Sequence, residues 1–261
     1  MVDGFSWRGR GMKASVATIE SERRCGEECP ICEAGVCAVL NVAELREVHH
    51  LGRRVHFARR ETVFREQEVA TSFFNLRKGI MRLHKLLPDG RRQILGFALP
   101  GDFLETHAFG RHKFSADAVG PVTVCKFDAA LFGQFSGDKP HLLKRMNELA
   151  ARELKRARDH MVLLGRRSAE GKVAAFLLDW RERLGPLGGS SDAVLLPMNR
   201  QDIADYFGLT IETVSRVFTR LERDGIIEIV HGGVRLLDPV RAKALTGKER
   251  QHRVRHTGYF R

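Results

Sequence analysis

The spacing of hydrophobic residues changes along this chain. Between residues 48 and 129, short apolar and aromatic runs alternate with turn signals, among them Pro88-Asp89-Gly90, Pro100-Gly101-Asp102 and Gly120-Pro121. Such punctuation is typical of the short strands of a β-roll, also called a double-stranded β-helix. Beyond residue 140, apolar residues recur every three or four positions, which predicts amphipathic helices. The sequence therefore predicts an α+β fold with an N-terminal β-roll followed by helices.

A long helix is predicted directly after the roll. Asp138 and Pro140 supply a start signal, and the helical spacing continues to Gly165. Such a helix would be about 40 Å long, too long for a small domain to cover, so we expect its apolar stripe to pair with a second copy as a coiled coil. Burial of the stripe within one chain is the alternative. The residues expected in this dimer interface are Met146, Ala150, Leu154, Ala157, Met161 and Leu164.

The C-terminal region has the pattern of a winged helix-turn-helix. Residues 169–184 predict an amphipathic helix, and residues 185–191 form a loop rich in Gly and Ser. A short helix carrying Ile203, Ala204 and Phe207 then meets a turn at Gly208, and a second helix starts with Thr210 as its N-cap. Two short runs within residues 226–237 flank a Gly-Gly pair and predict a hairpin, the wing.

The outward face of the second helix carries side chains of the types that bind DNA. In a major groove, Arg can bind guanine, Glu can accept from cytosine, and Ser or Thr can contact a base edge or a phosphate. The net charge of +12 also favours a polyanionic partner, with nucleic acid ahead of a membrane. The residues predicted to contact double-stranded DNA are Glu212, Thr213, Ser215, Arg216 and Arg220 of this helix and Arg200 of the helix before it.

Five cysteines form the second candidate site. Cys25, Cys29, Cys32 and Cys37 follow the spacing C-x3-C-x2-C-x4-C, and Cys125 stands alone far downstream. Thiolates at such short spacings can converge on one soft metal centre, as in iron-sulfur proteins. Alternatively, the N-terminal four bind structural zinc or act as a thiol switch, and neither requires Cys125. Burial of four unliganded thiols in so short a polar stretch is disfavoured.

The chain is expected to act in the cytoplasm. No window approaches the ~18 to 20 apolar residues of a membrane span, and the N-terminus lacks the pattern of a signal peptide. In that reducing compartment, clustered cysteines favour metal or redox chemistry over disulfides. Enzymatic function is the least favoured class, because the sequence shows no Gly-rich phosphate loop with Lys, no nucleophile elbow and no zinc-protease helix.

These patterns divide the chain into five segments. Residues 1–24 lack a hydrophobic period and are predicted to be a disordered leader. Residues 25–137 hold the cysteine loop and the β-roll sensor domain, residues 138–167 the dimerisation helix, and residues 168–239 the DNA-binding domain. Residues 240–261 form a basic tail, interpreted either as a solvated, frayed end or as an added phosphate contact.

The chain resembles the FNR branch of the CRP/FNR superfamily of bacterial transcription regulators. The resemblance extends from Cys25 to Pro239 and rests on the cysteine cluster, on Gly101-Asp102, and on residues 209–216, whose E-x-x-S-R core matches the recognition helix of that family. It implies an oxygen-labile four-iron four-sulfur (4Fe-4S) cluster bound by Cys29, Cys32, Cys37 and Cys125. Cys25 matches a nearby cysteine that is generally dispensable. The gap between Cys32 and Cys37 is one residue shorter than in the best-known member.

The resemblance also implies a mechanism. An intact cluster favours the homodimer, which binds palindromic operators like TTGAT-N4-ATCAA, and Glu212, Ser215 and Arg216 read each half-site. Loss of the cluster in oxygen gives a weakly binding monomer. Genes for low-oxygen growth are then activated through surface loops that touch RNA polymerase. One candidate loop by position is Pro88, Asp89, Gly90 and Arg91, although such a sequence is usually only a turn.

The chain departs from related families at two positions, and it offers one alternative cofactor site. Members of the FNR branch often carry an acidic residue on the dimer helix, where Ala157 stands here; Asp159 lies two residues further on. Cyclic-nucleotide receptors of the superfamily use an Arg to bind phosphate, where this chain has Phe114, so we disfavour a cyclic-nucleotide ligand. A heme site built from His49, His50, His107 and His112 is disfavoured because such histidines are usually only solvated.

Overall fold

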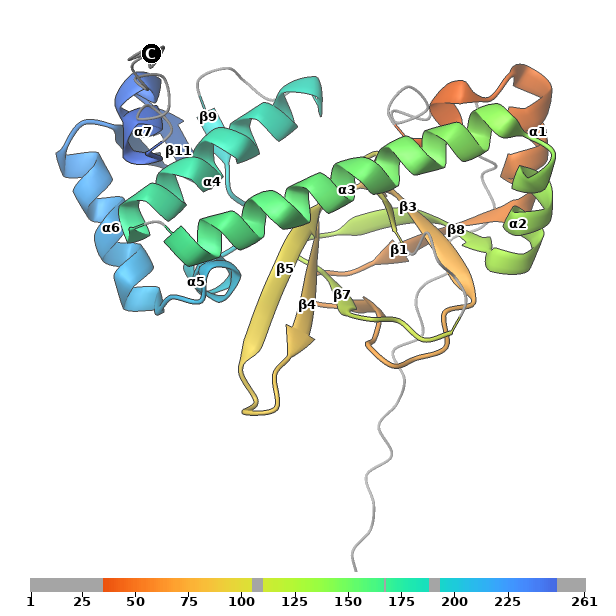
Figure 1. Ribbon diagram of the computed structural model, residues 1–261, viewed down its shortest axis with the longest axis horizontal. Helices are drawn as coiled ribbons and strands as arrows, with labels where there is room; N and C mark the ends of the chain where they lie inside the picture. Colours follow the sequence, from red (N-terminus) through yellow and green to blue (C-terminus); the bar gives the residue numbers. More distant parts are fainter. Residues whose placement is uncertain (1–34, 105–109, 167, 188–192, 248–261) are drawn as a thin grey trace, which may run out of the picture.

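The computed structural model describes residues 35–104, 110–166, 168–187 and 193–247. They form a β-roll, one long helix and a C-terminal winged domain, so the predicted α+β fold class is confirmed (Figure 1). The predicted leader, most of the basic tail, and Cys25, Cys29 and Cys32 lie outside the described residues.

A short helical segment precedes the roll. A 3-10 turn, η1 (Val36–Val39), leads into helix α1 (Val42–Leu51). Asn41 and Glu44 form a capping box in which each side chain accepts a hydrogen bond from the backbone N–H of the other residue, at 3.0 Å in both directions. The sequence did not predict these two elements.

The roll consists of two antiparallel four-stranded sheets. The first has the order β1 (Gly52–Phe57), β8 (Val122–Asp128), β3 (Ser72–Lys78) and β6 (Phe103–Leu104). The second has the order β2 (Thr62–Phe64), β7 (Ser115–Ala118), β4 (Met81–Leu86) and β5 (Arg92–Ala98). Side chains alternate between the two faces of a strand, so Phe74 and Leu76 of β3 fill the roll, whereas Phe73 packs on the outside with Phe103 and Phe127.

Helices α2 (Ala129–Gly137) and α3 (Pro140–Arg166) follow the roll. Asp128 caps α2 by accepting from the backbone N–H groups of Ala130 and Leu131. Figure 1 shows α3 crossing from the roll and α2 at one end of the molecule to the C-terminal domain at the other. The long helix that the sequence predicts between Pro140 and Gly165 is thus confirmed.

The C-terminal domain begins with helix α4 (Ala169–Leu184), within the bounds predicted from the sequence. It continues through η2 (Gly185–Leu187), β9 (Ala193–Leu195), α5 (Arg200–Phe207) and α6 (Ile211–Arg223), and ends with β10 (Ile227–Val230), β11 (Gly233–Leu236) and α7 (Pro239–Leu245). The wing is a three-stranded sheet of order β10-β11-β9, so the predicted hairpin gains a third strand that the sequence did not reveal.

The start of the basic tail is folded, which corrects the expectation of a frayed end from residue 240. Asp238 caps α7 by accepting from the Arg241 backbone N–H, and Pro239 occupies the first turn, where its missing N–H costs nothing. Ala242 is buried in the core of the C-terminal domain. Residues 240–245 therefore belong to that domain.

The roll and the C-terminal domain share one hydrophobic core. Phe97 of β5 packs against Phe176 and Trp180 of α4, with ring centroids 6.3 and 5.7 Å apart, and Leu163 of α3 joins the same cluster. The Trp180 indole N–H donates to the Leu195 carbonyl at 2.8 Å. This packing fixes the position of the C-terminal domain against the roll.

An ionic network reinforces this interface. Arg82 of β4 and Arg92 of β5 both donate to the buried Asp202 carboxylate of α5, at 3.0 and 2.7 Å. Arg92 also bonds Asp205, and Arg82 pairs with Asp117 of β7. Because the strands carrying both arginines form one hairpin, the network joins the β4–β5 hairpin to the first helix of the helix-turn-helix.

Candidate DNA-binding surface and cysteine site

Local backbone chemistry sets the two helices of the helix-turn-helix. Asn199 caps α5 through a capping box with Asp202, and Thr210 caps α6 by accepting from the Thr213 backbone N–H at 3.2 Å. Gly208 between them has φ +64°, a left-handed conformation that favours glycine and ends α5. The turn predicted at Gly208 and the N-cap predicted at Thr210 are both confirmed.

Helix α6 is strongly amphipathic. Its inward residues Val214, Val217, Phe218 and Leu221 are buried in the core, as predicted. On its outward side Glu212, Ser215, Arg216 and Arg220 are exposed. Thr213 is half-buried, and its hydroxyl lies 3.0 Å from that of Thr210, so it also serves the helix start. The structure therefore brings four of the five predicted residues of α6 onto its accessible side, and Thr213 is only partly exposed.

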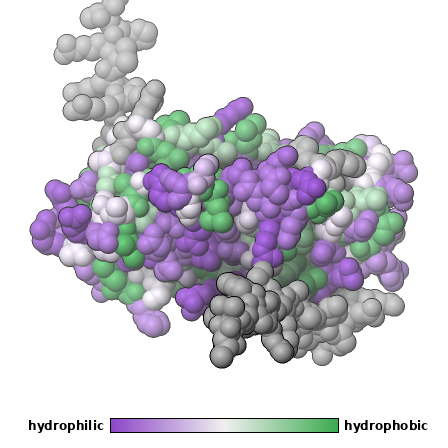
Figure 2. Space-filling view, turned by 90° about the horizontal axis from the view of Figure 1, so that it is seen from below, coloured by the Kyte–Doolittle hydropathy of each residue, from purple (hydrophilic) through white to green (hydrophobic). Residues whose placement is uncertain are grey.

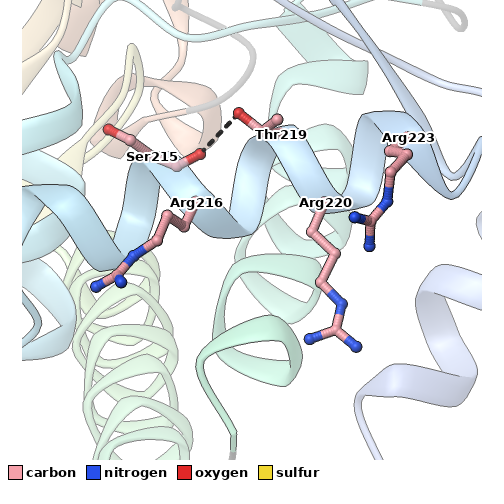
Figure 3. Close-up of a pocket in the computed structure, with 5 residues that line it drawn as sticks. All are labelled: Ser215, Arg216, Thr219, Arg220 and Arg223. Carbon is pink, nitrogen blue, oxygen red and sulfur yellow. Dashed lines mark hydrogen bonds between the residues drawn. The ribbon is translucent and has the colours of Figure 1, made fainter.

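A hollow on α6 is lined by Ser215, Arg216, Thr219, Arg220 and Arg223 (Figure 3). The three arginine side chains extend to one side of the helix, and the Thr219 hydroxyl donates to the Ser215 carbonyl at 3.2 Å. Sequence reasoning missed Arg223. The signal was present, because Arg216, Arg220 and Arg223 are four and three residues apart and so share one face of a helix.

Two predicted arginines also make contacts within the chain. The Arg220 guanidinium donates to the Glu170 carboxylate of α4 at 2.9 Å while remaining more than half exposed. The Arg200 guanidinium carbon lies 3.2 Å from the centroid of the Phe218 ring, and burial lowers the pKa of this guanidinium. Packing alone thus accounts for the place of Arg200, and its contact with DNA stays a prediction.

The predicted dimer stripe on α3 is partly covered. Leu154, Ala157 and Met161 are exposed, whereas Met146, Ala150 and Leu164 are half-buried. Met146 packs beside the cluster of Phe132 and Phe135. The middle of the helix thus presents apolar side chains to solvent in the single chain, while its first turns pack on the roll. Asp159 pairs with Lys155 at 2.9 Å.

Two of the predicted metal ligands lie in described parts of the chain. Cys37 of η1 and Cys125 of β8 are both buried, and both belong to the hydrophobic cluster between the first sheet, α2 and the start of α3. Segments almost ninety residues apart are thereby brought together. Within the described ranges no group of three or more His, Cys, Asp or Glu side chains is placed to hold a metal, since the other candidate cysteines fall outside them.

The surroundings of these cysteines suit a polar group. The Asn75 side chain is 1% exposed, and neither its oxygen nor its nitrogen has a hydrogen-bond partner among the described residues. Asn75 pairs directly with Cys125 across strands β3 and β8. A buried carboxamide needs a partner, and a sulfur-ligated cluster would supply acceptors at this place, so the site fits such a group.

The segment before Cys37 also contacts helix α3. The Arg145 guanidinium of α3 donates to the Gly35 carbonyl at 3.2 Å. Gly35 lies two residues before Cys37, so the described segment that leads into Cys37 is hydrogen-bonded to α3.

Three other candidate sites are the tip of the β4–β5 hairpin, His112 and the interior of the roll. The tip of the β4–β5 hairpin, with Pro88, Asp89, Gly90 and Arg91, is exposed, and Asp89 pairs with Arg91 at 2.7 Å. His112 is buried and stacks on Phe64 at 4.3 Å. Large side chains fill the roll interior: Phe57, Phe64, Phe74, Leu76, Met81 and Leu83.

Hydrophilic side chains predominate on the face drawn in Figure 2, with smaller hydrophobic areas between them. None of the helices in the described ranges combines the length and the hydropathy that crossing a bilayer requires.

Family models match both folded parts of the chain. A cyclic nucleotide-binding domain matches residues 54–138, and a Crp-like helix-turn-helix domain matches residues 171–244. A cyclic nucleotide-binding β-roll joined by a long helix to a winged helix-turn-helix defines a DNA-binding regulator.

The chain is also similar over most of its length to known regulatory proteins. Nitrogen fixation regulation protein FixK of Bradyrhizobium diazoefficiens is 65% identical over 234 residues, which cover 90% of this chain and 99% of that protein. Transcriptional activatory protein AadR of Rhodopseudomonas palustris is 55% identical, over 85% of this chain and 93% of its own length. The structure of FixK2 from Bradyrhizobium japonicum matches with a TM-score of 0.69 at 34% identity, covering 74% of this chain and 96% of that one. The chain belongs to the CRP/FNR family of transcription regulators, in which FixK and FnrL are FNR-branch relatives.

Proposed function

We propose that this protein is an oxygen-responsive transcription activator whose 4Fe-4S cluster is bound by Cys29, Cys32, Cys37 and Cys125. The observation that carries the proposal is the meeting of Cys37 and Cys125, from distant segments, in one buried cluster beside an unpartnered carboxamide. The cluster, when bound, supplies a centre that oxygen degrades. The names of FixK, AadR and FnrL relatives support regulation and activation of transcription.

The steps from the cysteines to DNA binding are carried out by residues of the chain itself. The segment that leads into Cys37 is bonded to α3, because the Arg145 guanidinium donates to the Gly35 carbonyl. With the loop ordered by its cysteines, α3 presents Leu154, Ala157 and Met161 to a second copy. Two chains then place two α6 helices on a palindromic site, in successive turns of the major groove. Without the cluster the loop loses its anchor and the dimer is weakened.

Helix α6 would read each half-site. Glu212, Ser215 and Arg216 are exposed on its first two turns, where a helix lying in the major groove meets the base edges. Arg220 and Arg223 lie further along the same helix and are suited to phosphates. We further propose operators like TTGAT-N4-ATCAA, and contact of the exposed Pro88–Arg91 tip with RNA polymerase.

Anaerobic purification tests the cofactor. We expect about four irons and four sulfides per chain, and a brown absorbance that bleaches when air is admitted. Cys125→Ala should lack iron yet keep its helical circular dichroism, because the residue is one small buried side chain. The matched control is Ser72→Ala, which also shortens a buried side chain in the same sheet. Bound zinc in place of iron, or normal iron in Cys125→Ala, would contradict the proposal.

Operator binding tests the surface. Arg216→Ala should weaken specific binding by about 1 to 3 kcal/mol, because a bidentate contact with guanine is lost. Lys113→Ala, which removes one exposed cation of the roll, is the control for net charge. Equal affinities of the two variants for a TTGAT-N4-ATCAA duplex would count against Arg216 as a reader of bases.

A further inference from the structure

Asn75 is a polar residue in a place built for an apolar one. It lies in the middle of β3, on the face that carries Phe73, and its side chain is 1% exposed. Neither amide atom has a hydrogen-bond partner among the described residues. Leaving a buried carboxamide unpaired destabilises the folded chain, whereas an apolar side chain of similar volume would not.

Asn75 lies between Cys125 on the neighbouring strand and the segment that leads into Cys37. It is the direct cross-strand partner of Cys125, and such partners share one face of a sheet with Cβ atoms about 4.5 to 5.5 Å apart. On the other side it touches the cysteine loop: a Cβ atom on Gly35 would lie 3.1 Å from Asn75 Oδ1 and 3.2 Å from Nδ2. Gly35 therefore lets the loop pass directly over the amide, two residues before Cys37.

We propose that Asn75 is a positioning residue of the cluster site, whose NH2 group donates a hydrogen bond to a sulfur atom of the bound cluster or of its thiolate ligands. The inference rests on the proposed function. Carboxamide nitrogen has two N–H donors, and thiolates and sulfides carry negative charge that accepts them. The cluster would thus be the missing acceptor for the buried NH2 group of Asn75.

A donor at this place changes the chemistry of the cluster. Hydrogen bonds to sulfur are among the features that set cluster potentials, and they favour the more negatively charged, reduced state. Removing the donor therefore makes the cluster easier to oxidise. Partners of metal ligands commonly change metal affinity by about 10- to 100-fold. We expect Asn75 to lengthen the life of the cluster in air and to raise its midpoint potential.

Asn75→Leu separates this role from a structural one. Without iron, the variant should unfold at a higher urea concentration than the wild type, because an unpaired amide is replaced by an apolar side chain. Loaded anaerobically, it should bind the same iron and sulfide, show a lower midpoint potential, and lose its absorbance in air on the order of tenfold faster. Ser72→Ala, a buried polar change on the opposite face of the same strand, should alter neither the potential nor the bleaching rate.

The outcomes distinguish the two proposals. A wild-type protein without iron and sulfide after anaerobic loading defeats the proposed function, and this inference with it. A loaded Asn75→Leu protein that bleaches at the wild-type rate with an unchanged potential defeats this inference alone. A lower urea midpoint for the iron-free variant would also overturn it, because Asn75 would then be needed by the chain itself.

Discussion

The ionic network between the β4–β5 hairpin and α5 predicts which of two substitutions lowers the free energy of unfolding more. Asp202 accepts from Arg82 and Arg92, yet each arginine keeps a second carboxylate, Asp117 for Arg82 at 3.3 Å and Asp205 for Arg92 at 2.7 Å. Two guanidinium groups therefore face three carboxylates. The nearby imidazole of His84 adds little positive charge at neutral pH, because burial lowers its pKa.

The balance of charges determines which of the two variants, Arg92→Ala or Asp202→Asn, is expected to be less stable. Arg92→Ala leaves three carboxylates with one guanidinium, and removing one member of a buried pair costs about 3 to 5 kcal/mol. Asp202→Asn leaves two charges of each sign, and its single oxygen can still accept from both arginines. Its NH2 group then faces the Asn199 N–H, so the variant loses that capping bond and should cost only about 1 to 2 kcal/mol. Arg92→Ala should therefore destabilise the protein more, although Asp202 is the more buried of the two: its side chain is 3% exposed and that of Arg92 is 24% exposed.

Urea unfolding at pH 7, followed by tryptophan fluorescence, measures this order. The chain has only Trp7 and Trp180, so a Trp7→Phe background leaves Trp180, whose ring packs against Phe97 across the domain interface. Arg91→Ala is the matched control, because the Arg91 side chain is 78% exposed and its loss should change the free energy of unfolding by less than about 0.5 kcal/mol. An Asp202→Asn variant less stable than Arg92→Ala would refute the charge count.

Three further predictions concern other parts of the chain. Burial lowers the pKa of His160 from 6.5 to about 4, so the unfolded chain takes up a proton below pH 6.5 that the folded chain does not. Between pH 6.5 and pH 4 the wild type should therefore lose up to about 3 kcal/mol of unfolding free energy relative to His160→Gln. The same pH dependence of the unfolding free energy in both proteins, measured with urea, would exclude this. Leu154→Glu should abolish the dimer of the anaerobic protein in sedimentation, whereas Val240→Glu, at a more exposed position on α7, should not. Arg223→Ala should lower operator and non-operator affinity alike and make the salt dependence shallower by about one unit, unlike Arg216→Ala.

The sequence predicted those elements whose own residues determine them. Helices α4 and α6 carry clear helical spacing, and the turn before α6 needs only Gly208 and Thr210, which are two residues apart in the chain. The outward surface of α6 followed from the same spacing. Arg223 was missed only because the stripe was not followed to the end of the helix.

Features that depend on distant partners could not be predicted. Strand β9 is three residues long and exists because β11 offers it an edge. The role of Asp202 is invisible in the local sequence, where it is simply the third residue of a capping box; its partners Arg82 and Arg92 lie more than a hundred residues away. The unpaired state of Asn75 likewise appears only when β3, β8 and the Gly35 segment are placed together.

Helix α3 connects these distant parts. Near its start Arg145 holds the Gly35 carbonyl, in its middle Arg156 pairs with Asp102 of the roll at 3.1 Å, and near its end His160 stacks on Tyr206 of α5 at 3.9 Å. A single helix of 27 residues thus contacts the cysteine loop, the roll and the helix-turn-helix. In the proposed switch, a change at the cysteines therefore needs no relay through the roll, because the helix that meets the loop also forms the dimer face and supports α5. This arrangement predicts that Arg145→Ala uncouples cluster loss from dimerisation while leaving iron content unchanged. If oxygen still dissociated the Arg145→Ala dimer as it does the wild type, the signal would have to travel by another route.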